Sequence, residues 1–231
     1  MSVGPTAAAA AIVASAPAPA PALSVGEATP SDSLFLALPG APAYSAFRTD
    51  ALQLSINSLL LSAATPSPKV TRIRTLYVHY VNPAPTTLAR STLSDPTSAE
   101  RLDLEALLLD AGAETGPLSR ESSTEVLRRV VRGGQVVMQT EDRRLILVYV
   151  SPRKGTISPW SSKATSIAHV CGLEKFVERI ERGVLIGLET ESGQVDVKVF
   201  ADLLYDRMTE VCMACTASLC IVLILIRRYR P

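Results

Sequence analysis

One stretch, Ser151–Leu173, constrains the fold of this chain more tightly than any other. It reads SPRKGTISPWSSKATSIAHVCGL. A residue before proline is held out of the helical region, so Ser158-Pro159 predicts an extended approach. Ser161 or Ser162 then stands where a helix N-cap belongs, because a serine hydroxyl can accept a hydrogen bond from an unpaired backbone N–H. The stretch therefore predicts a strand, a tight turn and a short capped helix.

The expected helix should bury one apolar face. Residues at i, i+3, i+4 and i+7 form that face, namely Ala164, Ile167, Ala168 and Cys171. Gly172 stands where a left-handed residue would end the helix. On this pattern Cys171 is a small buried side chain rather than a nucleophile.

The turn before the helix has two interpretations. Its candidate site residues are Arg153, Gly155, Thr156, Ser158, Trp160, Ser161, Ser162 and Lys163. A helix N-terminus with nearby cations can bind a phosphate of a substrate or nucleotide. Alternatively the turn is a capped helix start whose Trp160 and serines pack against a neighbouring domain. No glycine-rich phosphate loop accompanies the turn, which favours packing. On that interpretation the turn lies at a sheet edge, partly exposed, and Trp160→Ala should barely change the melting of this chain.

The stretch resembles the N-terminal part of the phosphoribosylformylglycinamidine synthases. The resemblance rests on Arg153, Gly155, the run Thr156–Thr165, the run Ile167–His169, Cys171 and Gly172. Further similar blocks are Pro39-Gly40, Tyr44–Asp50, Leu76–Asn82, Val177–Gly183 and Tyr205–Thr209. Ser166 departs from the family pattern, which has Asp or Asn there. The resemblance extends from about Pro39 to Val211.

The resemblance implies a role in purine synthesis. Full-length members convert formylglycinamide ribonucleotide to the amidine with ATP, Mg²⁺ and glutamine, and their first domain resembles a dimer of a small separate subunit. The synthase signature Asn-Ser-Glu-His-Cys-Arg-His and the glutaminase nucleophile do not occur in this sequence. The chain is therefore expected to hold no catalytic residue and no cofactor, and to partner the synthase and glutaminase domains of the same enzyme. Two alternatives are a stand-alone module that docks on a separate synthase and a membrane-tethered protein.

An apolar tail is expected to follow the domain at 212–231. Its uncharged part would rise only ~24 Å as a helix, short of a ~30 Å membrane core, so a membrane span is disfavoured. If the tail is foreign to the domain, deleting it should leave folding intact and improve solubility. Cys212 and Cys215 have metal or redox spacing, but no second pair accompanies them, so a coincidence is favoured.

The N-terminal segment 1–33 is rich in Ala and Pro and is expected to be flexible. It contains no Lys or Arg, which disfavours secretory and mitochondrial leaders and makes the cytoplasm the expected compartment. The formal net charge is +1 and no basic stripe with interleaved aromatic residues appears, so no nucleic-acid partner is expected. Neither His79 nor His169 has a carboxylate at a telling spacing, and both are expected to be structural.

Periodicity predicts an α+β domain over 34–211. The expected helices are Phe47–Leu61, a helix capped by Thr97 and Glu100 that runs through Leu109, and Val197–Met208. The expected strands are Val70–Val81, Arg144–Val150 and Phe176–Leu188. The residues at about 114–141 are expected to form a polar surface insertion. Together these elements predict an antiparallel sheet with helices packed on one face.

Overall fold

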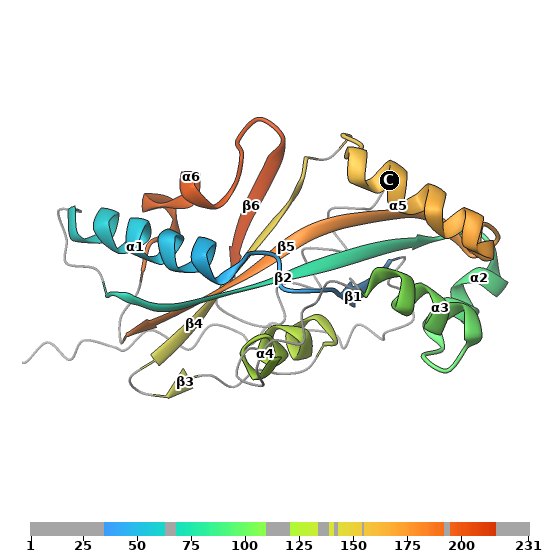
Figure 1. Ribbon diagram of the computed structural model, residues 1–231, viewed down its shortest axis with the longest axis horizontal. Coiled ribbons are helices and arrows are strands. Elements are labelled where there is room, and N and C mark those ends of the chain that lie inside the picture. Colours follow the sequence, from blue (N-terminus) through green and yellow to red (C-terminus); the bar gives the residue numbers. More distant parts are fainter. Residues whose placement is uncertain are drawn as a thin grey trace, which may run out of the picture. The chain divides into compact units, whose positions relative to one another are not determined.

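The computed structural model describes residues 35–62, 68–109, 121–133, 139–140, 143–153, 155–191 and 195–215. These residues form one antiparallel sheet in the order β1-β2-β5-β4-β3, with β6 also paired to β4 (Figure 1). The strands are β1 Leu36–Pro39, β2 Val70–Pro83, β3 Gln139–Thr140, β4 Arg143–Pro152, β5 Val177–Glu191 and β6 Glu210–Cys215. The helices are α1 Ala46–Ser62, α2 Thr87–Ser94, α3 Ala99–Leu108, α4 Glu121–Val131, α5 Pro159–Ala168 and α6 Ala201–Leu204. The expected α+β class with an antiparallel sheet is confirmed.

The centre of the sheet relates two similar halves. β1-α1-β2 and β4-α5-β5 each consist of a strand, a helix and a long strand that pairs antiparallel with the first. The two long strands pair with each other along nearly their whole length, with Tyr77 opposite Val184. Both begin with the pattern Val-x-Arg-Ile, at Val70 and at Val177. An approximate twofold between β2 and β5 therefore relates the halves, as a resemblance to a dimer of a small subunit leads one to expect.

Helices cover both faces of the sheet, and the expectation of helices on one face was wrong. Ile146, Val148 and Val150 of β4 point to a face on which α1 and α6 pack. Leu147 and Tyr149, the alternate residues, point to the opposite face, where α4 packs. Figure 1 shows α1 and α6 on one side of the long strands and α4 on the other.

Helix α4 lies within the segment expected to be a polar insertion, and for Glu121–Val131 that expectation was wrong. Residues 114–120, 134–138 and 141 of this segment lie outside the described residues. Leu127, Val130 and Val131 are buried against the sheet at i, i+3 and i+4. Arg128 and Arg129 lie between these positions in the sequence and conceal the apolar stripe. A short amphipathic helix with two arginines and several other polar residues thus has the composition of a loop but the spacing of a packed element.

Most of the other expected elements are confirmed, with corrections at their ends. α1, β2, β4 and β5 agree with the expected segments to within three residues at each end. The N-cap of α3 is Ser98 rather than Thr97, since the Ser98 side chain accepts from the Arg101 amide. α2 had not been expected. In place of a closing helix to Met208, a 3-10 turn at Val197–Val199 and the short α6 precede strand β6.

Strand β6 crosses the expected boundary between domain and tail. It pairs with β4 from Glu210 opposite Pro152 to Cys215 opposite Leu147. Cys212 and Met213 pack against the core clusters of the two faces. Cys212–Cys215 therefore belong to the sheet, and an apolar tail starting at Cys212 was wrong for these four residues. The rest of the expected tail lies outside the described residues, as does the N-terminal segment.

Candidate functional site

The motif helix begins one turn earlier than expected. Ser158, not Ser161 or Ser162, is the N-cap of α5, and its hydroxyl accepts from the Ser161 amide at 3.0 Å. Pro159 takes the first helical position, where the missing N–H costs nothing and the fixed φ suits the helix. The extended approach expected from Ser158-Pro159 is confirmed, because Ser158 has φ −72° and ψ 146°.

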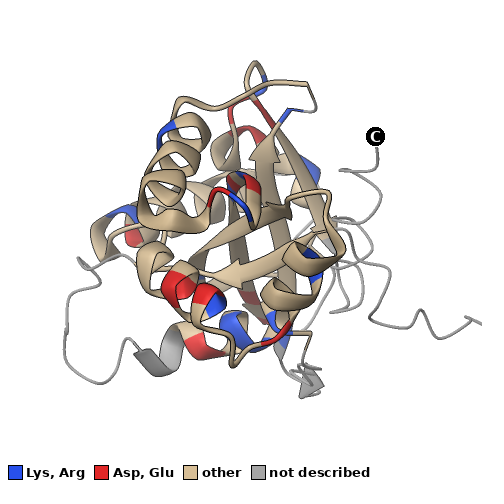
Figure 2. Ribbon diagram, turned by 90° about the vertical axis from the view of Figure 1, so that its right-hand side faces the viewer, with Lys and Arg blue, Asp and Glu red and all other residues tan. Residues whose placement is uncertain are grey.

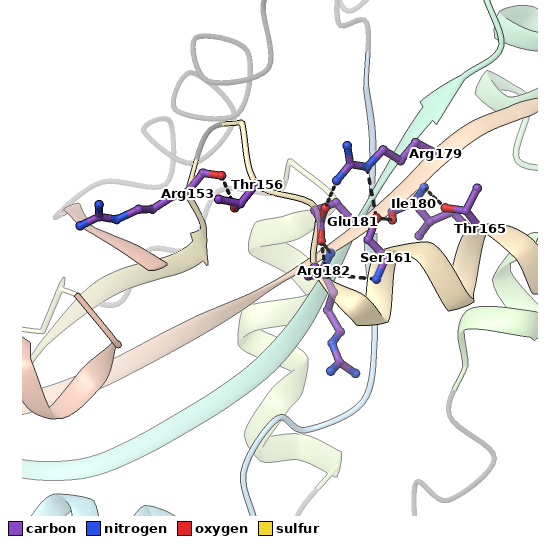
Figure 3. A network of polar contacts seen from close by, with 9 residues as sticks. Arg153, Thr156, Ser161, Thr165, Arg179, Ile180, Glu181 and Arg182 are labelled. Carbon is purple, nitrogen blue, oxygen red and sulfur yellow. Dashed lines mark hydrogen bonds and ion pairs between the residues drawn. The ribbon is translucent and has the colours of Figure 1, made fainter. Parts of the chain in front are cut away.

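Helix α5 lies along an open edge of β5. β4 pairs with β5 only over Val184–Glu191, so among the described strands the preceding half of β5 has a neighbour on the β2 side alone. Side chains of α5 supply the missing hydrogen bonds on the other side (Figure 3). The Ser161 hydroxyl donates to the Ile180 carbonyl at 2.6 Å, and the Ile180 amide donates to the Thr165 hydroxyl at 3.0 Å.

His169 continues the same stripe, with Nε2 2.8 Å from the Val177 carbonyl oxygen. Ser161, Thr165 and His169 stand at i, i+4 and i+8, on one side of the helix. The first half of the domain repeats the arrangement, because the Asn57 amide of α1 donates to the Val70 carbonyl at 2.9 Å and accepts from the Val70 amide. In both halves, helix side chains cover a strand edge that would otherwise expose unpaired backbone groups.

A buried carboxylate joins the helix start to the strand. Glu181 is 5% exposed. One oxygen accepts from the Ser158 hydroxyl at 2.7 Å, and the other from the Arg179 guanidinium at 2.6 Å. Arg179 Nε also donates to the Ser161 hydroxyl at 3.1 Å, which closes a network between α5 and β5 (Figure 3). Charge-assisted bonds of this kind fix the position of the helix start against the strand.

Trp160 lies in a stack of side chains over one face of β2 and β5. Its ring stacks on His79 of β2, with centroids 5.3 Å apart and planes 22° from parallel. The Arg182 guanidinium lies 4.4 Å from the Trp160 centroid and 4.2 Å from the Tyr77 centroid, so it is held between two aromatic faces. Gly40 allows this packing, since a Cβ there would lie 2.4 Å from His79 Nε2.

The Arg153 turn meets a second block of the resemblance. The Arg153 amide donates to the Thr209 carbonyl at 2.9 Å, and its guanidinium donates to the Arg207 carbonyl. In the segment that Arg153 contacts, the Asp206 carboxylate accepts hydrogen bonds from the Met208 amide and the Thr209 hydroxyl. These hydrogen bonds lower the pKa of the Asp206 carboxyl. The Arg153 turn and the segment Tyr205–Thr209, more than fifty residues later in the sequence, are thus joined by hydrogen bonds.

The remaining candidate residues lie on the surface of this turn. Gly155 has φ 84°, a left-handed conformation that glycine adopts without strain. The Thr156 hydroxyl donates to the Arg153 carbonyl at 2.6 Å. Gly155, Thr156, Ser162 and Lys163 are exposed, whereas Ser158 and Trp160 are half-buried and Ser161 is buried. The candidate residues therefore divide into an inner group that binds β5 and an outer group that faces solvent.

The expected apolar face of the helix was partly wrong. Ala168 is buried and Ala164 half-buried, but Ile167 is 52% exposed and Cys171 is exposed. The stripe of Ser161, Thr165 and His169 faces the sheet edge, and this rotation turns Ile167 and Cys171 outward. The left-handed Gly172 was expected correctly, at φ 89°.

Sequence reasoning missed Thr165, Arg179 and Glu181 as partners of the motif. The signal for Thr165 was the spacing of four between polar residues that can all bond to backbone. Among the described residues, no group of three or more His, Cys, Asp or Glu side chains is arranged to hold a metal ion. The carboxylate oxygens that Mg²⁺ prefers are thus not gathered in this part of the chain. In the view of Figure 2, Lys and Arg residues are interspersed with Asp and Glu along the described ribbons.

No helix in the described part of the chain combines the length and the apolar character that a membrane crossing needs. The apolar run after Cys215 lies outside that part.

Comparisons with known proteins agree with the resemblance. Residues 76–220 match the family model described as formylglycinamide ribonucleotide amidotransferase N-terminal. The chain is 38% identical over 180 residues to phosphoribosylformylglycinamidine synthase of Saccharomyces cerevisiae, a match over 75% of this chain and 12% of that protein. The chain thus corresponds to a small part of the length of this curated relative. The family match continues past Val211, where the resemblance was expected to stop. The chain belongs to the formylglycinamide ribonucleotide amidotransferase N-terminal family.

Proposed function

We propose that this chain is the N-terminal structural and docking domain of a phosphoribosylformylglycinamidine synthase. The full enzyme would convert formylglycinamide ribonucleotide to formylglycinamidine ribonucleotide with ATP and glutamine, in the cytoplasm, during purine synthesis. The synthase and glutaminase domains would be its partners within one polypeptide, and would hold ATP and Mg²⁺. The 38% identity to the yeast enzyme supports this assignment.

One observation carries the structural part of the proposal. The side chains of Ser158, Ser161, Thr165 and His169 all bind β5 of the same domain. Each of these side chains has a partner that fixes the fold, so the inner part of the motif positions α5 rather than a substrate. The outer residues of the turn, such as Thr156 and Lys163, remain available for contacts with the rest of the enzyme.

The chain alone is expected to release no ammonia from glutamine and to form no amidine. A nucleophile with an oriented base is needed for the first reaction. The side chains of Ser161, Thr165 and His169 are held by β5, and the thiol of Cys171 is exposed on the surface of the domain. An assay of purified, folded chain with glutamine, and then with ATP, Mg²⁺ and formylglycinamide ribonucleotide, tests this expectation. Ammonia release above a heat-denatured control would contradict it.

A chimera tests the docking part. In this chimera, residues 1–220 of the chain replace the matching N-terminal part of the yeast enzyme. Expression in yeast that lacks its own enzyme is expected to restore growth without added purines, because the domain would support the synthase in its natural place. The control is the same yeast enzyme without any N-terminal replacement. If the chimera is expressed at a normal level but growth is not restored, the proposed function is wrong for this chain.

A further inference from the structure

Helix α1 carries a second apolar face that points away from the sheet. Its inner side packs on the core through Ile56 and Leu60. On the outer side, Phe47 is 83% exposed, Leu54 is 73% exposed and Leu61 is 87% exposed. Large exposed apolar side chains gathered on one element are uncommon on monomers and mark interaction sites.

The outer side has the spacing of a helix–helix seam. Ala51 and Ser58, both exposed, stand between the three large residues. We call these five residues, Phe47, Ala51, Leu54, Ser58 and Leu61, the outer stripe. Their spacing alternates between four and three residues, which is the repeat that keeps a seam facing a partner helix. Large and small residues alternate along it, so a second helix can approach closely at Ala51 and Ser58.

The distribution of charged residues on α1 limits which kind of partner can cover the outer stripe. Its only charged residues are Arg48 and Asp50, near its start, and residues 51–62 carry none. A partner that covers the outer stripe must therefore be apolar over most of its length, because a charge placed there would lose its water without gaining an opposite charge. An amphipathic helix that presents its apolar face to α1 meets this requirement.

We propose that the outer stripe is a docking surface for an amphipathic helix supplied by the remainder of the full-length enzyme. This inference rests on the proposed function. The matched region is 12% of the yeast relative, so most of such a polypeptide lies outside the domain and is tethered to it. A tethered segment meets the stripe at a high effective concentration, which favours it over a second copy of the chain.

Accessibility of a cysteine placed on the stripe tests the proposal directly. Ser58→Cys puts a thiol at a small exposed position, and Ser91→Cys on α2 is the matched control. Each variant is made in the 231-residue chain and in the chimera, and alkylation by a maleimide is followed peptide by peptide. In the chimera, alkylation of Cys at position 58 is expected to slow by about tenfold or more, as for a site that reacts only on local opening. Alkylation at position 91 is expected to stay the same.

A second variant links the stripe to activity. Leu54→Asp in the chimera is expected to abolish growth without purines, whereas Leu88→Asp, at another exposed leucine, should not. Equal alkylation at position 58 in the two proteins, with growth restored by the chimera, would overturn the stripe assignment and leave the proposed function standing. Protection that appears in the 231-residue chain and rises with its concentration would make a second copy the occupant and overturn the proposal. A chimera that does not support growth would overturn the proposed function and this inference with it.

Discussion

A chain truncated after Val211 is expected to melt roughly 6–12 °C below the intact chain, since a loss of about 3 kcal/mol shifts a domain of this size by that much. The truncation removes Cys212–Cys215, four of the six residues of β6. Cys212 packs against the core of one face and Met213 against the core of the other. Their apolar burial and the lost ladder bonds to β4 account for a cost of about 3 kcal/mol.

Truncation after Cys215 provides the control, because it keeps all of β6. Thermal unfolding followed by circular dichroism distinguishes the two truncated chains. Both remove most of the apolar run, so a difference between them reports on the strand. Equal melting temperatures after both truncations would show that β6 adds nothing to the stability of the sheet. The sequence alone had suggested that result, since the apolar run begins at Val211.

Trp160→Ala is expected to lower the free energy of unfolding of the 231-residue chain by about 2 kcal/mol. This loss is smaller than the ~3–5 kcal/mol typical of fully buried Trp and Phe, because Trp160 is half-buried. The substitution removes the stack on His79 and one of the two faces that hold Arg182. It also opens a gap beside the cluster of Leu173 and Ile180. This replaces the expectation from sequence that the melting would barely change.

Two controls accompany this substitution. Trp160→Phe keeps an aromatic face for His79 and should recover a substantial part of the loss. Ile167→Ala, at an exposed position on the same helix, should cost well under 1 kcal/mol, as surface substitutions do. Denaturant unfolding of the four proteins measures these differences. A Trp160→Ala chain as stable as the parent would mean that the indole is held only by contacts outside the domain.

The long strands could be predicted from the sequence because their patterns are local. Alternation of apolar and polar residues, together with β-branched side chains, identified β2, and a short continuous apolar run identified β4 as a buried strand. α4 could not be predicted in the same way, because the adjacent Arg128 and Arg129 interrupt its apolar residues and its apolar stripe is only three residues long. β6 was missed for the opposite reason: its apolar residues merge with the run that follows, so no change of composition marks the end of the strand.

The sequence singled out the candidate residues of the motif, but it did not reveal their partners in the fold. Ser158 was taken as part of the approach because it precedes a proline, although a proline at the first helical position favours a cap directly before it. Trp160 stacks on His79, about eighty residues away in the chain, and no local pattern can report such a contact. The role of Thr165 depends on the open edge of β5, which exists only because β4 turns away after Val150.

The motif helix closes the edge of β5 with its polar side chains. Amide hydrogen exchange at Ile180 tests this most directly, because that N–H donates to the Thr165 hydroxyl at 3.0 Å. Thr165→Val keeps the shape of the side chain and removes the acceptor. Leu185, a buried residue of the same strand, reports on global unfolding, and Ser162→Ala is the control on the exposed side of the helix.

The rate of amide exchange at Ile180, relative to that at Leu185, is expected to rise by about tenfold or more in the Thr165→Val chain. In the Ser162→Ala chain it is expected to stay unchanged, because only Thr165→Val removes a hydrogen bond that protects the edge of β5. Unchanged protection of Ile180 in the Thr165→Val chain would contradict the account.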